Sequence, residues 1–314
     1  GILVSVGAAL AAGSRLALSE RFTPGTFVAD ARRVGASVVF YAGEMLRPLL
    51  FERPGRGDRN LPIRIFAGSG IRADLAARLH ERFGAGVIEF YAGTAHKIIL
   101  ANATGQKPGA LGRVLPGSAE VALIEVDRAT KRPIRGDDGF FVRTPRGKEG
   151  LLVARVGSDE EDRALPGVVE GAFASDDRWF VSTDVLREDE DGDYWFVDSL
   201  GSFALLDGQP VSVRRVEDAL YSLPEVELAA VVPTVSNGVT GLAAAFTSPA
   251  PIARARIDEA LAVLAPHERP SLVRQVDEIP MTDGFRPRKA EVARALGRVP
   301  VPAYSSPKPW SATS

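Results

Sequence analysis

The chain has 314 residues, which is enough for a sizeable core and for two domains of ordinary size. Hydrophobic residues make up 45% and charged residues 25%, a balance typical of a globular protein that argues against a disordered or fibrous chain. A net charge of −2 offers no overall basic field to a nucleic acid, and the absence of cysteine excludes disulfides, thiolate metal sites and a cysteine nucleophile.

The first residues are apolar and helix-like, but glycines and Arg15 interrupt the apolar stretch too early for a membrane span. The sequence starts without methionine and without a basic leader. We therefore expect the chain to be a fragment of a longer protein that begins inside a fold.

The first hundred residues predict alternating helices and strands. Helices are expected over Ile2–Ala12, Pro24–Val34, Glu44–Phe51 and Arg72–Phe83. Strands are expected over Arg15–Leu18, Ser37–Tyr41, Ile63–Ala67 and Val87–Tyr91. This alternation predicts parallel βαβ units, with helices on the faces of the sheet.

The pattern changes at about Ala119. Short strands separated by turns predict a small antiparallel region, with strands over Val121–Val126, Gly150–Val156 and Tyr194–Val197. The last hundred residues predict an α+β module with strands over Ala204–Leu206, Leu228–Val232, Leu242–Phe246 and Val273–Gln275. Its helices are expected over Val213–Leu220, Ala253–Leu264 and Arg288–Leu296.

We predict three parts: a large domain over residues 1–198, a small mobile domain over 199–299, and a disordered Pro- and Ser-rich tail over 300–314. The predicted fold class is α/β followed by α+β. The hinge is placed near Asp198–Ser202.

Seven segments occur in an order and spacing that together resemble one family. They are GSG at Gly68–Gly70, EFYAGT at Glu89–Thr94, GALGRVLPG at Gly109–Gly117, Asp127–Leu152, Trp179–Gly201, DGQPVS at Asp207–Ser212 and Ile279–Val292. The chain resembles the C-terminal part of the AMP-forming acyl-CoA synthetases, within the adenylate-forming superfamily. The long-chain and very-long-chain fatty acyl-CoA synthetase and fatty-acid-transport group is the most similar.

This resemblance implies an enzyme that makes an acyl-adenylate from ATP and a fatty acid and then transfers the acyl group to CoA. It implies ATP, Mg²⁺ and CoA, and a small C-terminal domain that rotates between the two half-reactions. The family's phosphate loop is not found in the chain and is expected in a preceding half. The family group implies a cytoplasmic protein, with peripheral membrane association left open, and the oligomeric state is not predicted.

The resemblance also implies roles for particular residues. Gly68, Ser69 and Gly70 would form the adenine wall, although a tight strand-to-helix turn explains them as well. In the stretch Tyr91, Ala92, Gly93 and Thr94, the tyrosine would stack on adenine and the threonine would lie near the phosphates and the carboxylate. Asp184 would accept hydrogen bonds from the ribose hydroxyls, and a capping or turn aspartate is the alternative.

Several positions depart from the family pattern. Ala95 replaces the glutamate that holds Mg²⁺, and no metal ligand is predicted because a methyl group cannot coordinate this ion; His96 beside it is no substitute. In the hinge, Ser199 replaces an arginine and Ser202 an aspartate. Arg286 replaces the catalytic lysine, and Lys289 is interpreted as a solvated residue at a helix start rather than as its substitute.

Because Ala95, Ser199 and Arg286 would meet around the same phosphate, we hypothesise a fatty acyl-CoA synthetase with impaired adenylation. Two alternatives stay open. One is an inactive homologue, a pseudoenzyme, that binds an acyl or adenylate ligand or acts as a partner domain. The other is a module that transfers the acyl group from a preformed acyl-adenylate.

Overall fold

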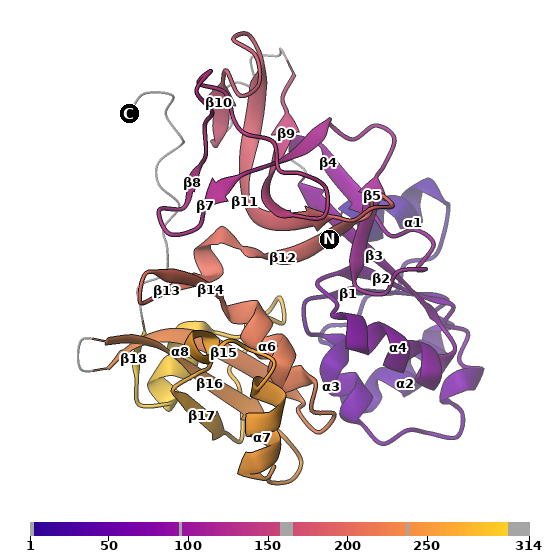
Figure 1. Cartoon of the computed structure of the whole chain (residues 1–314). Helices are drawn as coiled ribbons and strands as arrows, with labels where there is room; N and C mark the ends of the chain where they lie inside the picture. Colours follow the sequence, from indigo (N-terminus) through magenta and orange to yellow (C-terminus); the bar gives the residue numbers. More distant parts are fainter. Residues whose placement is uncertain (1–2, 94–95, 158–165, 237–238, 301–314) are drawn as a thin grey trace. The chain divides into compact units, whose positions relative to one another are not determined.

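The computed structural model describes residues 3–93, 96–157, 166–236 and 239–300 (Figure 1). The chain packs into two compact units. Unit 1 comprises Gly1–Tyr91, Ala101–Gly112 and Met281–Arg286, and unit 2 comprises Ala92–Leu100, Arg113–Pro280 and Pro287–Ser314. The two units group residues by how they pack and do not test the predicted domain boundary between residues 198 and 199. That boundary stays a prediction.

Unit 1 is a parallel sheet with helices. Its helical elements are η1 (Leu3–Gly7), α1 (Ala8–Ala11), α2 (Pro24–Val34), α3 (Leu46–Phe51), η2 (Asp58–Asn60) and α4 (Ala73–Phe83). Strands β1 (Val38–Ala42), β2 (Ile65–Ser69) and β3 (Gly86–Gly93) pair in parallel in the order β1-β2-β3. Strands β4 (Ile98–Ala101) and β5 (Ala110–Val114) follow along the chain. Each of these two strands has residues in both units.

The core of unit 1 forms where apolar faces of the helices meet the sheet. Helix α4 buries Leu75, Ala76, Leu79 and Phe83, a spacing that makes one apolar stripe along a helix. This stripe packs with Phe66 of the central strand β2, which is fully buried, as expected for a strand of a parallel sheet covered by helices.

The first part of unit 2 is an antiparallel sheet. Its long strand is β11 (Arg178–Glu188), which pairs with β10 (Val168–Glu170), β9 (Glu149–Arg155) and β12 (Tyr194–Ser199). Strand β6 (Val121–Ile124) pairs with β9 on its far side, and β7 (Val126–Asp127) forms a short ladder with β8 (Arg132–Pro133). The inner face of this sheet has its own core around Leu151, Val153, Trp179 and Val181.

The second part of unit 2 is an α+β module (Figure 1, orange to yellow). A four-stranded sheet has the order β17-β16-β15-β18, in which β15 and β16 form an antiparallel hairpin and β17 runs parallel to β16. The elements are η4 (Leu200–Ser202), β13 (Phe203–Leu206), β14 (Gln209–Ser212), α6 (Val213–Tyr221), β15 (Leu228–Ser236), β16 (Val239–Thr247), α7 (Arg254–Leu261), η5 (Pro266–Glu268), β17 (Leu272–Gln275), α8 (Lys289–Ala295) and β18 (Val299–Pro300). Helices α6 and α7 share one apolar core with this sheet.

The predicted fold class, α/β followed by antiparallel and α+β regions, is confirmed. Helix α2 begins and ends at the predicted residues, although the Thr23 side chain makes no capping hydrogen bond. The strand predicted at Arg15–Leu18 is wrong, because this alternating segment finds no strand to pair with and leaves Leu18 84% exposed. The predicted tail lies almost wholly outside the described residues.

Candidate functional site

The predicted adenine wall lies where β2 ends in unit 1. Gly68 is the residue that lets strand β1 approach, because a Cβ at this position would lie 2.3 Å from the Tyr41 carbonyl oxygen and 2.7 Å from its ring. Ser69 continues the contact, since its carbonyl accepts a hydrogen bond of 2.9 Å from the Gly43 amide. Gly70 follows with a φ of +101°, a conformation that favours glycine.

Glu89 fixes this wall from the neighbouring strand β3. Its side chain is buried, and one carboxylate oxygen accepts the Gly70 amide at 2.5 Å. The other oxygen accepts the Tyr41 hydroxyl. Burial, and then the Glu89 charge, raise the pKa of Tyr41, which stays a protonated donor. This role of Glu89 was not predicted, although a carboxylate inside the apolar strand run VIEFY was the signal.

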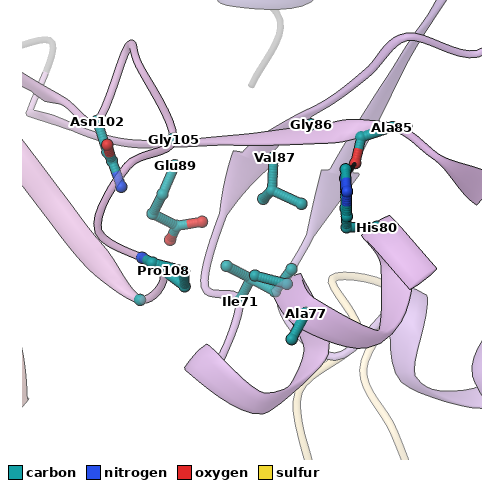
Figure 2. A pocket seen from close by; sticks show the side chains of 12 residues that line it. Ile71, Ala77, His80, Ala85, Gly86, Val87, Glu89, Asn102, Gly105 and Pro108 are labelled. Carbon is teal, nitrogen blue, oxygen red and sulfur yellow. Dashed lines mark hydrogen bonds between the residues drawn. The ribbon is translucent and has the colours of Figure 1, made fainter.

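A cavity of about 240 Å³ adjoins the wall within unit 1 (Figure 2). It lies between α4, β3 and the segment 102–109, and its lining includes Ile71, His80, Val87, Glu89 and Asn102. Pockets that hold a drug-sized ligand take about 300–1,000 Å³. The cavity is therefore too small to hold an entire acyl-adenylate.

The predicted stacking residue, Tyr91, lies near the end of β3 and is half-buried, and Ala92 and Gly93 follow it in the same strand. Thr94 and Ala95 lie outside the described residues. His96 stacks on the Phe180 ring with parallel planes, which explains it as a packing residue.

The loop that carries Arg286 packs with unit 1. Thr282 closes it through three hydrogen bonds: its amide donates to the Arg286 carbonyl at 2.8 Å, its carbonyl accepts the Phe285 amide at 3.0 Å, and its hydroxyl accepts the Arg286 amide at 3.2 Å. Arg286 itself is exposed. The loop therefore presents a guanidinium to solvent from a turn with defined geometry.

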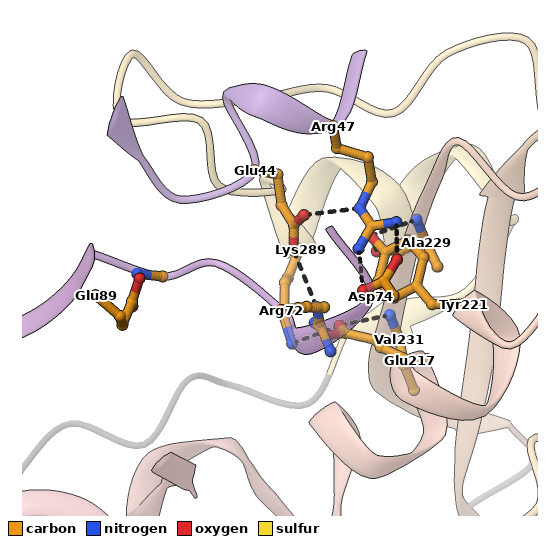
Figure 3. Close-up of polar contacts among 11 residues, drawn as sticks. Glu44, Arg47, Arg72, Asp74, Glu89, Glu217, Tyr221, Ala229, Val231 and Lys289 are labelled. Carbon is orange, nitrogen blue, oxygen red and sulfur yellow. Dashed lines mark hydrogen bonds and ion pairs between the residues drawn. The ribbon is translucent and has the colours of Figure 1, made fainter. Parts of the chain in front are cut away.

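A buried ion-pair network lies at the start of α3 and α4 (Figure 3). Arg47, with a side chain 1% exposed, contacts Glu44 at 2.9 Å and both carboxylate oxygens of Asp74 at 3.1 and 3.2 Å. Arg72 contacts the other oxygen of Glu44 at 3.0 Å. The network holds the turn after β1 against the first turn of α4.

In unit 2, the residues predicted for the ribose and for the hinge meet. Asp184 on β11 pairs directly with Ser199 on β12 in the antiparallel ladder. Residues opposite one another in such a ladder have Cβ atoms about 4.5–5.5 Å apart. The Ser182 hydroxyl accepts the Asp184 amide at 3.1 Å and shapes the strand beside the carboxylate. Ser202 is half-buried in η4, three residues further on.

Two carboxylates of unit 2, Asp198 and Glu217, are buried. Asp198 accepts the Ser212 hydroxyl at 2.5 Å and the Ser199 amide at 2.8 Å. Glu217 on α6 accepts the Lys289 ammonium at 3.3 Å (Figure 3). Lys289 begins α8 as interpreted, and its side chain is 40% exposed, but its ammonium also pairs with this buried carboxylate of α6.

Asp198 is expected to lower the free energy of unfolding as the pH rises, which is the opposite of the usual effect of an aspartate. Burial raises its pKa above the ordinary 3.8, despite the hydrogen bond from Ser212. Its stabilising contribution is therefore complete below about pH 3.8 and is lost as the pH rises through the raised pKa. Relative to Asp198→Asn, the unchanged chain should gain free energy of unfolding when the pH falls from 7 to 4, as measured by urea unfolding.

Asp30 is the matched control. A hydrogen bond from Arg33 lowers its pKa, so its contribution is present above about pH 3.8 and is lost as the pH falls. Asp30→Asn should therefore change the pH dependence in the opposite sense. A difference between the chain and Asp198→Asn that does not vary with pH would contradict the assignment.

Mg²⁺, which the resemblance implies, requires oxygen ligands. The alanine at position 95 supplies none. Within the described ranges, no cluster of three or more histidine and acidic side chains is arranged to hold a metal ion. The side chain that the resemblance places at the magnesium position therefore offers this ion no ligand. None of the helices described here combines the length and apolar character that crossing a membrane requires.

Comparison with known proteins finds relatives that match over almost the whole of this chain. No protein-family model matches it. Long-chain fatty acid transport protein 1 of Homo sapiens is 30% identical over 312 residues, which cover 94% of this chain and 48% of that protein. Long-chain fatty acid transport protein 5 of Mus musculus is 28% identical over 324 residues, covering 97% and 47%. The chain thus spans about half the length of the curated relatives that it matches.

Solved structures agree on the fold. ATP-bound MatB from Rhodopseudomonas palustris superposes with a TM-score of 0.73 at 20% identity, over 94% of this chain and 57% of that chain. The amide bond synthetase McbA from Marinactinospora thermotolerans gives 0.69 at 25% identity, over 93% and 60%. The chain is therefore a relative of the AMP-forming acyl-CoA synthetases, of their long-chain fatty acid transport group in particular, and corresponds to about half of such a protein.

Proposed function

We propose that the chain forms the C-terminal part of a fatty acyl-CoA synthetase in which the adenylation step is slowed. A carboxylate oxygen of the fatty acid attacks the α-phosphorus of ATP, the bond to the β-phosphate breaks, and pyrophosphate leaves. The sulfur of the CoA thiol then attacks the acyl carbon and the thiol proton is released, while the bond from the acyl carbon to the phosphate oxygen breaks and AMP leaves.

One observation carries this proposal. The glycine wall at Gly68–Gly70 and the Arg286 loop, which the resemblance assigns to adenine and to the reacting carboxylate, belong to the same compact unit. They are separated by more than 200 residues of sequence. To stabilise a negatively charged phosphate in the transition state, a protein must hold a positive charge in a fixed place near the bound nucleotide. A unit that contains both a nucleotide surface and a fixed positive charge can do this.

Each residue then has a defined part. Gly68–Gly70 offer a flat backbone surface to the adenine, and Tyr91 supplies an aromatic ring for stacking, which is worth about 1–3 kcal/mol per base. Asp184 accepts the ribose hydroxyls. Arg286 stabilises charge on the carboxylate and α-phosphate oxygens.

The substitutions explain why adenylation would be slow. Ser199, opposite Asp184, brings a hydroxyl where the family has a charged fork. Ala95 removes a carboxylate. Arg286 keeps the charge of the family lysine but spreads it over a larger planar group, so its fit to the same oxygens is poorer.

A direct test is calorimetric titration of the protein at its natural length with a non-hydrolysable acyl-adenylate analogue, an acyl sulfamoyl adenosine. We expect micromolar binding. Asp184→Ala should weaken it about 10- to 100-fold, because a hydrogen bond to a charged group is worth about 1.5–3 kcal/mol. The control Asp258→Ala removes a carboxylate that is exposed on α7 and should leave the affinity unchanged.

Absence of binding, or binding that Asp184→Ala does not weaken, would contradict the proposal. The two alternatives separate in turnover by the protein at its natural length. An inactive homologue would bind the analogue without releasing pyrophosphate from ATP. An acyl-transfer module would consume supplied acyl-AMP with CoA but would not make it.

A further inference from the structure

Three backbone segments meet at Gly43, in the turn that follows β1. A Cβ built on Gly43 would lie 2.8 Å from the Phe285 carbonyl oxygen and 2.9 Å from that of Gly284. On its other side, a Cβ built on Gly70 would lie 3.1 Å from the Gly43 Cα. Gly43 therefore lies in close backbone contact with both the glycine wall and the Arg286 loop, a packing that a larger residue would disturb.

The loop is also bound to this turn by hydrogen bonding and ring packing. The Glu44 amide donates to the Phe285 carbonyl at 3.1 Å. The Phe285 ring meets the Phe22 ring edge to face, with centroids 5.7 Å apart and an interplanar angle of 88°. Phe285 has a φ of +56°, an uncommon conformation for a bulky residue that indicates a constraint from its surroundings.

The turn itself is rigidly held. The Glu44 carboxylate contacts Arg47 at 2.9 Å and Arg72 at 3.0 Å, and both arginine side chains are at most 8% exposed. The Gly43 amide is bound to the Ser69 carbonyl at 2.9 Å. A fixed turn that touches the loop on one side and the wall on the other can set the distance between them.

We propose that Ala42–Glu44 is a docking seat for the loop Met281–Arg286, and that Gly43 is the positioning residue that places Arg286 relative to the adenine wall. This inference rests on the proposed function, because it gives the seat a part in adenylation. Gly43 acts through Arg286 and touches no substrate itself.

The experiment compares acyl-AMP formation by the protein at its natural length with that of Gly43→Ala, Arg286→Ala and the double variant. Gly43→Ala should lower kcat about tenfold or more, since misplacing a catalytic group by about 1 Å can cost 10²-fold. The KM for ATP should stay within about twofold, because the lost interaction belongs to the transition state. In the Arg286→Ala background, Gly43→Ala should have no further effect on kcat.

Amide hydrogen–deuterium exchange tests the seat without relying on activity. Gly43→Ala should increase exchange at the Glu44 amide and across residues 282–286. The matched control is Gly13→Ala: Gly13 has a φ of +59°, similar to the +52° of Gly43, but apart from its two chain neighbours no atom of the described residues lies within 4 Å of its Cβ position. It should change neither the exchange nor kcat. Phe22→Leu, which removes the ring contact but keeps an apolar side chain, should raise loop exchange in the same direction to a smaller extent.

Unchanged exchange at the Glu44 amide and the loop in both Gly43→Ala and Phe22→Leu would overturn the seat. If Gly43→Ala lowers kcat by the same factor in the Arg286→Ala variant as in the unchanged protein, the positioning role is overturned. If the unchanged protein forms no acyl-AMP, the proposed function fails, and the exchange measurement still decides whether the seat exists.

Discussion

Replacing Arg286 by alanine is expected to lower the rate of acyl-AMP formation by about 10²–10³-fold in the protein at its natural length. Removing one preorganised group that stabilises developing charge typically has an effect of this size. The reason lies in the loop: Thr282 closes it through three hydrogen bonds, and it packs with the unit that carries the glycine wall. The measurement is single-turnover formation of acyl-AMP from ATP and a fatty acid.

Two variants make this prediction specific. Arg286→Lys restores the compact charge of the family and should keep or raise the rate. Arg274→Ala removes an exposed arginine on β17 and should leave it unchanged. A rate that survives Arg286→Ala would show that another group carries the charge stabilisation and would remove Arg286 from the site.

Replacing Arg47 by alanine is expected to lower the free energy of unfolding by about 3 kcal/mol. Breaking a buried ion pair by removing one partner typically costs about 3–5 kcal/mol, because the remaining charge stays buried without its partner. Here Arg72 still pairs with Glu44, and Asp74 is 36% exposed and can be hydrated, so the lower end of the range applies. Urea unfolding monitored by circular dichroism measures the change.

The chain offers a closely matched control. Arg33 pairs with Asp30 at the same i,i+3 spacing as Arg47 with Glu44, but its side chain is 72% exposed. Exposed pairs contribute about 0–1 kcal/mol, so Arg33→Ala should change the free energy of unfolding little. Equal effects of the two substitutions would contradict the view that burial makes the Arg47 network matter.

The spacing of apolar residues predicted helices such as α4 well, because the apolar stripe of such a helix is the face that it buries in the folded chain. Helix α4 lies where the spacing of Leu75, Leu79 and Phe83 placed it. The long strand β11 was missed, because Arg178–Glu188 mixes buried and exposed residues without strict alternation. A β-bulge between Val185 and Leu186 in its pairing with β12 adds to that irregularity. Its pairing with β9, earlier in the chain, and with β12, its hairpin partner, makes this segment a strand.

The candidate site could be predicted only in part for a similar reason. The motif residues are local, and Gly68–Gly70 does end a strand as expected. The meeting of Gly43 with Phe285 depends on packing between segments far apart in sequence, and that of Asp184 with Ser199 depends on the register of the β11–β12 hairpin, which a bulge shifts. No pattern of spacing along the chain encodes those distances.

The most direct test of the central claim is ATP–pyrophosphate exchange by the protein at its natural length, measured with and without a long-chain fatty acid. The account predicts exchange that depends on the fatty acid, proceeds slowly, and falls about 10²-fold or more in Arg286→Ala. Exchange that is absent with every fatty acid, while the acyl-adenylate analogue still binds, would contradict it and identify an adenylate-binding protein that does not catalyse adenylation.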